Sequence, residues 1–409
     1  MLKVLHTADW HLGQKLFHKS RKEEHKAALD WLLELVIKEN IELLIVAGDV
    51  FDTDNPSNYA RQLYYDFLQQ LQTTPCQSVV VVAGNHDSAN MLDATKKLLG
   101  NLSIFVVGNI PEDRHQQIIP IRHAKTGALQ AVVAAVPYLR DRDVRKSVAG
   151  EEHERGIERL KAGIHQHYQE VAEAIAPYVH ENVPLIVTGH LYAAGGERGE
   201  RPDIIHIGHA DVIKTDAFSE VFDYVALGHL HRIQQLDKPR PIWYSGSLIP
   251  LDFSELNYSQ CVRIITFEGK KIVKSQNVPV HLIRKLRNFR GDIEKIKSDL
   301  HNLSPSAGLD TWLRLEVQTD IQLPHLQEEL EEILADKPAE IMQLKLLNTA
   351  LRSIDSTAYQ QLQSLDDLEA IDVFRLAAQQ NGTLEEDALQ QLENSFKELL
   401  SWMQERPKE

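Results

Sequence analysis

Short apolar runs alternate with longer helix-like segments along the first 275 or so residues. The runs are rich in Val, Ile and Leu and end in polar turns, which is typical of buried strands. Between the first three runs, residues 21–38 and 59–71 repeat apolar positions at the spacing of one helix face. Seven runs are predicted as strands, at residues 3–7, 42–47, 78–83, 131–136, 185–188, 224–227 and 242–245. This alternation predicts an α/β sandwich over residues 1–278, with a more strand-rich later part.

The remainder of the chain divides into two smaller blocks. Residues 279–348 predict a small α+β domain, with strand-like and helix-like segments alternating at 281–289, 292–302, 311–318, 323–335 and 340–346. Residues 349–409 have no strand pattern but contain two apolar helical stripes, with helix-start signals at Ser364 and Thr383. We predict a C-terminal helical pair that docks on a partner. Packing of the pair on the protein's own core is the alternative.

Composition narrows the class of protein. The 409 residues carry a formal net charge of −15, which argues against a protein that coats nucleic acid by bulk electrostatics. Cys76 and Cys261 are too few for a disulfide framework, suit a reducing compartment and are predicted as core thiols. No apolar run approaches the roughly 20 residues that span a bilayer, and the start lacks a signal-peptide pattern. A cytoplasmic protein is therefore expected.

Five short motifs follow predicted strands and carry the candidate chemistry. They are Asp9-Trp10-His11, Gly48-Asp49, Gly84-Asn85-His86-Asp87, Gly189-His190 and Gly228-His229-Leu230-His231. Ligand sites in open α/β sheets lie outside the carboxyl ends of strands, so these motifs are expected to meet at one rim. Their carboxylates, amide and imidazoles suit two divalent transition metals, because no thiolate biases the site towards a structural zinc. Two such ions about 3.5–4 Å apart suit in-line displacement at phosphorus.

These motifs, in this order, resemble those of the calcineurin-like metallophosphoesterases, and the residues around them are most similar to those of the SbcD nuclease-subunit family. The closer similarity lies in residues 6–13, 47–52 and 83–88. The resemblance implies two mixed sheets flanked by helices, a capping domain over 279–348 and two bound divalent ions, Mn²⁺ in preference to others. By motif, Asp9, His11 and His231 hold one ion, Asn85, His190 and His229 hold the other, and Asp49 bridges them.

The resemblance also assigns two residues that are not ligands. His86 is implied to protonate the leaving oxygen, a role that suits a side chain whose ordinary pKa is near neutrality. Asp52, three residues after the bridging Asp49, resembles the position that orients this histidine in related phosphatases. Hydroxide is expected to attack phosphorus in line, without a covalent intermediate.

The family further implies a DNA nuclease that functions in repair, replication and recombination. It implies ATP-dependent double-strand exonuclease and single-strand or hairpin endonuclease activity with SbcC, an ATPase partner, in a complex that contains two copies of this chain. The chain has no G-x-x-x-x-G-K-[ST] segment, so any ATP dependence has to come from that partner. The alternatives are a small-molecule phosphodiesterase or protein phosphatase on the same scaffold, and a non-enzymatic scaffold, which would have lost a ligand.

Basic residues that open the second block are candidates for DNA-backbone contacts. These residues are Arg284, Lys285, Arg287 and Arg290. Local positive charge is needed to approach phosphates despite a negative total, although a solvated face is the commoner fate of such a run.

The remaining histidines and Trp10 receive structural interpretations. His6, inside the first strand, is predicted as a core histidine, Trp10 as a packing residue, and His209 as no ligand despite its preceding glycine. The others are predicted to be solvated: His18, His25, His115, His123, His153, His165, His167 and His180.

Overall fold

The computed structural model describes residues 1–144, 153–193, 195–196, 213–304, 308–319 and 325–347. Nearly all of these belong to one compact unit, formed by 1–317 with 323–346. The predicted helical pair lies outside the described residues. Among the described helices, none is both long and apolar enough to cross a membrane.

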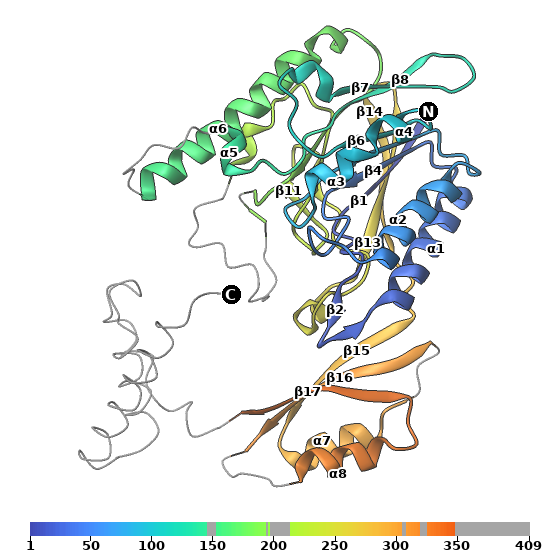
Figure 1. Ribbon diagram of the computed structural model, residues 1–409, viewed down its shortest axis with the longest axis vertical. Coiled ribbons are helices and arrows are strands. Elements are labelled where there is room, and N and C mark those ends of the chain that lie inside the picture. Colours follow the sequence, from blue (N-terminus) through green and yellow to red (C-terminus); the bar gives the residue numbers. More distant parts are fainter. Residues whose placement is uncertain (145–152, 194, 197–212, 305–307, 320–324, 348–409) are drawn as a thin grey trace. The chain divides into compact units, whose positions relative to one another are not determined.

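The first of two large sheets is built around four parallel strands. Its order is β14-β13-β1-β4-β5-β6, in which β13 pairs antiparallel with both β1 and β14. The strands are β1 (Leu2–Thr7), β4 (Leu43–Ala47), β5 (Ser78–Val82), β6 (Ile104–Val107), β13 (Cys261–Glu268) and β14 (Lys271–Pro279). Helices α1 (Lys22–Glu39) and α2 (Asn58–Leu71) lie side by side and bury apolar faces against this sheet (Figure 1).

The second sheet has the same number of strands and its own helix. Its order is β11-β12-β10-β9-β8-β7, with β12, β10, β9 and β8 parallel. The strands are β7 (Ile118–Arg122), β8 (Leu129–Ala134), β9 (Leu185–His190), β10 (Tyr224–Gly228), β11 (Gln234–Asp237) and β12 (Ile242–Tyr244). Helix α6 (His153–Ile175) packs its buried residues against this sheet.

The two sheets also pack on each other, so that their central strands are buried on both faces. Val80 of β5 and Val133 of β8 belong to the apolar layer between the sheets. Strands buried on both faces are expected to be continuous apolar runs, which is why β4 and β5 have the sequences LLIVA and SVVVV. Each fully buried Val or Ile contributes about 1.5–3 kcal/mol relative to its exposed state.

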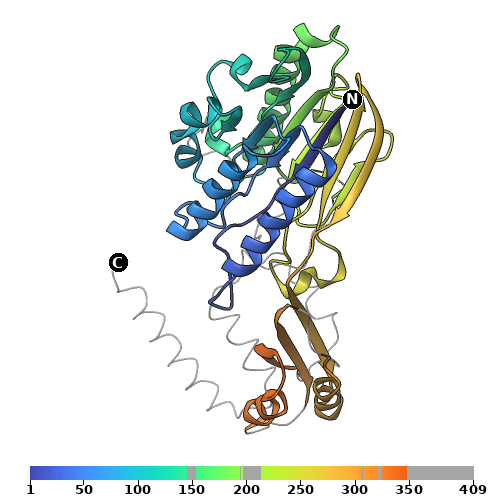
Figure 2. The same ribbon diagram turned by 90° about the vertical axis from the view of Figure 1, so that its right-hand side faces the viewer.

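Shorter elements complete this part of the chain. They are β2 (Lys15–Leu16), β3 (Lys19–Ser20), α3 (Ala89–Ala94), α4 (Lys96–Gly100), α5 (Asp141–Val144) and the 3₁₀ turns η1 (Arg114–Gln117), η2 (Ala176–Tyr178), η4 (Thr215–Ala217) and η5 (Phe253–Asn257). Figure 2 shows α1 and α2, in blue, running along the sheet that contains the blue strands.

Residues 284–347 form a three-stranded sheet with two helices, which we call the capping domain. Its sheet order is β15 (Arg284–Gly291), β16 (Leu309–Gln318), β17 (Ala339–Leu347). Helices α7 (Ile293–His301) and α8 (Leu326–Leu334) share an apolar cluster with one face of the sheet. The Asp292 side chain accepts from the Lys295 N–H at the start of α7, which satisfies an unpaired helix donor. The opposite face packs Leu286 and Trp312 against Phe253.

The observed elements include several that the apolar pattern does not predict. Strand β14 is mostly exposed and contains three polar residues in succession, Lys274, Ser275 and Gln276, so no apolar run marks it. It is an edge strand, and pairing with β13 places it in the sheet. Strands β6, β7, β11 and β13 and helix α6 were also not predicted. Of the two cysteines, Cys261 is buried as predicted and Cys76 is partly buried.

Candidate active site

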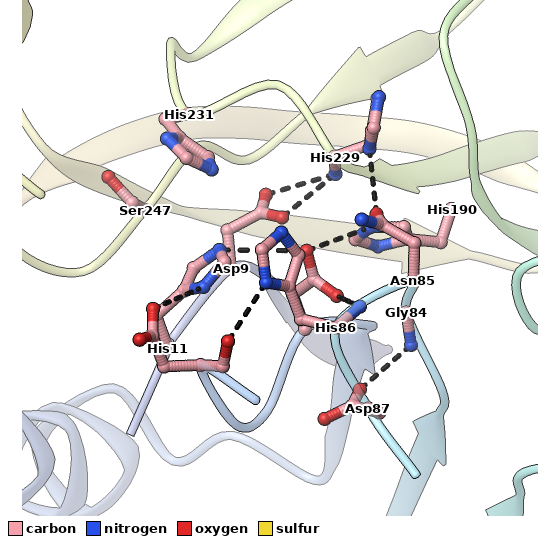
Figure 3. A network of polar contacts seen from close by, with 12 residues as sticks. Asp9, His11, Gly84, Asn85, His86, Asp87, His190, His229, His231 and Ser247 are labelled. Carbon is pink, nitrogen blue, oxygen red and sulfur yellow. Dashed lines mark hydrogen bonds and ion pairs between the residues drawn. The ribbon is translucent and has the colours of Figure 1, made fainter. Parts of the chain in front are cut away.

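The carboxyl ends of five strands bring the five motifs together at one rim. Strands β1, β4 and β5 come from the first sheet, and β9 and β10 from the second. The loops after β1 and β4 are joined by main-chain hydrogen bonds, because Asp9 N–H donates to Gly48 O and His11 N–H to Asp49 O, both at 3.0 Å. Figure 3 shows the resulting cluster of side chains.

Asp87 holds the loops after β4 and β5 in register. Its buried carboxylate accepts from the N–H groups of Val50 (3.1 Å), Phe51 (2.9 Å) and Gly84 (2.8 Å). Burial, followed by the negative charge of Asp49, raises the pKa of Asp87 to about 6, while these N–H donors oppose the shift. The sequence pattern contained Asp87 within a motif but gave no sign of this positioning role.

The glycines before two of the ligands provide space for this convergence. A Cβ atom on Gly48 would overlap the His190 ring, and one on Gly84 would overlap the Asp49 carboxylate. Gly48 also has a φ of +91°, a conformation that side chains disfavour. Any other residue at either position would displace a candidate ligand.

Three of the predicted ligands form one compact group. Donor atoms of Asp9, His11 and His231 lie within 4.8 Å of one another. Asp9 and His11 are buried, and the His11 and His231 rings have centroids 5.1 Å apart. The Asp9 carboxylate also accepts from the His229 N–H at 2.9 Å, which ties β1 to the loop after β10.

The other predicted ligands converge beside this group. His190 Nε2 lies 3.2 Å from Asp49 Oδ2 and 3.0 Å from Asn85 Oδ1, and His229 Nδ1 lies 3.0 Å from the same amide oxygen. His190 Nδ1 donates to Ala47 O at 2.9 Å. In neutral His190 this bond leaves a lone pair on Nε2 that faces oxygen atoms, so the arrangement favours a cation or a proton between them.

The charges of the site are coupled in the same sense. Burial raises the pKa of Asp9. Burial would also raise the pKa of Asp49, but the imidazoles of His190, His11 and His86 outweigh it and hold that pKa below its usual range. Burial opposes protonation of His190, yet the Asp49 carboxylate prevails and raises the pKa of His190 to about 9. A proton therefore neutralises this cluster where a cation is not bound.

His11 supports the fit to a metal independently. Both of its ring nitrogens are buried and make no hydrogen bond of good geometry with the described residues. The nearest carboxylate oxygens lie 3.5 Å from Nε2, on Asp49, and 3.3 Å from Nδ1, on Asp52. A buried imidazole that faces a carboxylate on each side matches a ligand whose second nitrogen is oriented by an acid.

His86 and Asp52 adjoin the cluster, and the structure specifies how they meet. The exposed His86 ring donates from Nδ1 to the main-chain oxygen of Asp52 at 2.9 Å, and its N–H donates to Asp49 Oδ1 at 2.9 Å. The Asp52 carboxylate lies against His11. Whether that carboxylate orients His86 stays a prediction; the hydrogen bond described here comes from the main chain.

The structural interpretations of other residues are partly confirmed. Buried His6 accepts from Tyr224 O–H through Nδ1 (3.0 Å) and donates through Nε2 to Leu227 O (3.2 Å). Trp10 is buried against Phe67 and donates to Thr7 Oγ1, as a packing residue should. The prediction of solvated rings is wrong for two histidines, His25 and His167, whose helices turn them into the core. His209 and the side chain of His153 lie outside the described residues.

The basic cluster is divided by the alternation of β15. Arg284 is corrected to a structural residue: its side chain is 10% exposed, donates to Glu24 at 2.8 Å and lies over the Trp312 ring. Lys285 and Arg287 project to one side of the strand and Arg290 to the other. Arg290 lines a polar cavity of about 710 Å³ together with Arg314 and Lys345.

Comparison with known proteins decides the family. Residues 2–233 match the model of the calcineurin-like phosphoesterases. This chain belongs to the calcineurin-like phosphoesterase family. Residues 283–381 match a second model, described as a Type 5 capsule protein repressor C-terminal domain. Membership makes the chain a hydrolase of phosphodiester bonds that uses divalent metal ions.

The similar curated proteins are all named as the SbcD subunit of the nuclease SbcCD. The one from Escherichia coli (strain K12) is 35% identical over 402 residues, which are 97% of each chain. Its counterpart in Rhodobacter capsulatus is 37% identical over 66% of this phosphoesterase and 67% of its own length. The Bacillus subtilis protein is 30% identical over 81% and 82%, respectively.

Proposed function

We propose that this chain is the metal-dependent DNA nuclease subunit of an SbcCD-type complex. The observation that carries the proposal is the convergence of seven oxygen and nitrogen donors from two sheets beside His86, an exposed imidazole. The relatives named as the SbcD subunit of the nuclease SbcCD support DNA as the substrate.

Two divalent ions would occupy this cluster, and we assign them as Mn²⁺ because carboxylate, amide and imidazole donors suit that ion. The first would be held by Asp9, His11 and His231, the second by Asn85, His190 and His229, with Asp49 between them. When bound, the ions supply an activated water and stabilise charge on the phosphate oxygens.

The protein's own residues orient the reaction. Because Nδ1 of His86 donates to Asp52 O, the opposite nitrogen, Nε2, is available to give a proton to the leaving sugar oxygen. The main-chain bond is compatible with both protonation states of the ring. Asp87 keeps Asp49 and Asn85 in register by tying their loops together.

We further propose the setting of this activity. The nuclease domain extends over residues 1–278, and the capping domain over 279–348 contacts DNA through Lys285, Arg287 and Arg290. Residues 349–409 dock SbcC, which supplies ATP dependence. Two copies of the chain act within a cytoplasmic heterotetramer on double-strand ends, hairpins and single strands.

An end-labelled DNA hairpin tests the proposal. The purified chain should open the hairpin slowly with Mn²⁺ alone and, with SbcC and ATP, should also degrade the duplex. Asp49→Asn should abolish both reactions, whereas Lys271→Gln, on the exposed edge strand, should leave both unchanged. Rapid hydrolysis of a nitrophenyl phosphodiester without DNA cleavage in either condition would favour the small-molecule alternative instead.

A further inference from the structure

Glu255 is a buried acid next to one of the candidate ligands. It lies in η5 and is 1% exposed. Its Oε1 accepts from His231 Nδ1 at 2.8 Å, and its Oε2 accepts from the Leu251 N–H at 2.8 Å. Both carboxylate oxygens are therefore engaged, so the acid is fixed relative to the His231 ring.

This contact selects one form of His231. A neutral imidazole that donates from Nδ1 carries its lone pair on Nε2, which is the form that binds a metal. A carboxylate behind a ligating histidine also makes the ring more basic and holds its orientation, and loss of such a partner typically weakens metal binding 10–100-fold.

The segment that carries Glu255 also contacts the capping domain. Asp252 lies 3.3 Å from Arg314 Nη2, and the Arg314 guanidinium lies 4.6 Å from the centre of the Phe253 ring. Phe253 is buried in one apolar cluster with Leu286 and Trp312 of the capping sheet. Four consecutive residues thus connect β15 and β16 to the partner of His231.

A second set of contacts holds the chain just before η5. Buried Arg21 donates to Pro250 O at 2.8 Å and to Glu24 at 2.8 Å. The same Glu24 oxygen accepts from Arg284 of the capping domain at 2.8 Å. The loop that leads to Glu255 is therefore bound to the capping domain through Arg284 as well as through Arg314.

We propose that Glu255 is a positioning residue for His231 and that the contacts between Arg314 and residues 252–253 make occupation of the first ion site depend on the seating of the capping domain. The inference rests on the proposed function, because it takes His231 as a ligand of the ion that Asp9 and His11 also hold. Displacement of the capping domain would loosen η5 and, through Glu255, that ion.

Calorimetric titration of the full-length protein with Mn²⁺ tests this proposal without measuring cleavage. Glu255→Ala should weaken one of the two binding events 10–100-fold and leave the other unchanged, while Glu255→Gln, which keeps an acceptor for Nδ1–H, should restore part of the affinity. Arg314→Leu should weaken the same event by a smaller factor. Glu268→Gln, a surface substitution on β13, is the matched control.

Asp9→Asn separates failure of this inference from failure of the proposed function. If Asp9→Asn removes one binding event but both Glu255 variants bind Mn²⁺ like the wild type, the role of Glu255 is wrong. Unchanged binding in Arg314→Leu overturns the link to the capping domain. If Asp9→Asn itself binds two ions normally, the assigned metal site is wrong. Thermal unfolding of each variant identifies any that fail to fold, and Glu255→Gln, nearly isosteric, then remains for the test.

Discussion

At the scale of single residues, His86 differs from its neighbours because it is exposed beside buried ligands. Substitution by Gln removes the proton donor but preserves a polar side chain, so we expect cleavage of hairpin DNA to fall about 10²–10⁴-fold with both Mn²⁺ ions retained. Rate measurements and calorimetry on the same preparation check this expectation, with His115→Gln as the exposed-histidine control. Loss of an ion together with activity would make His86 a ligand.

His6 predicts how stability depends on pH. Burial, followed by the charge of Arg263, lowers the pKa of His6 to about 3. The folded protein thus keeps this ring neutral while the unfolded chain binds a proton below about pH 6.5, so stability is lost as the pH falls. Between pH 7.5 and 5 the contribution of His6 to the unfolding free energy should fall by about 2 kcal/mol.

Urea unfolding of the chelator-treated protein at these two pH values tests the sign. His6→Asn should be less stable than the wild type at pH 7.5, and the gap between them should narrow at pH 5. A gap that stays constant would show that His6 is protonated in the folded protein.

The residues that the sequence revealed and those that it concealed differ in a physical way. Asp9, His190 and His231 sit in short motifs at strand ends, where local sequence alone indicates chemistry. Glu255 makes its contact with His231 across 24 positions of chain, and Arg284 meets Glu24 across 260. No local pattern encodes such partners, so the sequence could not separate a structural arginine from a phosphate-binding one.

At the scale of elements, alternation along β15 refines the predicted DNA contacts. Replacing Lys285, Arg287 and Arg290 by Gln should weaken binding to duplexes of any sequence and reduce the salt dependence by about 0.9 per lost phosphate contact. The matched control is Lys271→Gln with Lys274→Gln on exposed β14. Titrations at several salt concentrations that give equal slopes for the variant and the wild type would remove β15 from the DNA interface.

Buried strands were predictable and edge strands were not. The apolar runs of β1, β4 and β5 follow from burial on both faces, and the predicted bounds agree closely with the observed ones. Strand β14 is defined by pairing with β13, a long-range property that its mostly polar sequence does not reveal. The helices of the capping domain were found because their apolar stripes face a single sheet.

At the scale of the whole molecule, catalysis and partner docking are assigned to separate parts of the chain. Deleting residues from 350 onward should leave Mn²⁺ binding and slow hairpin cleavage intact, because every candidate ligand lies between Asp9 and His231. Co-purification with SbcC and stimulation by ATP should both disappear. A truncated protein that still binds SbcC and responds to ATP would favour packing of the tail on its own core.

The crowding at Gly48 and Gly84 has a consequence for how active and inactive relatives can be told apart. A homologue that retains every metal-binding side chain but carries alanine at either glycine would still match a search for the ligands. Its Cβ would occupy the place of the His190 ring or of the Asp49 carboxylate, and the metal pair could not assemble. Surveys that score ligands alone would count such pseudoenzymes as nucleases, and inspection of two small residues would exclude them.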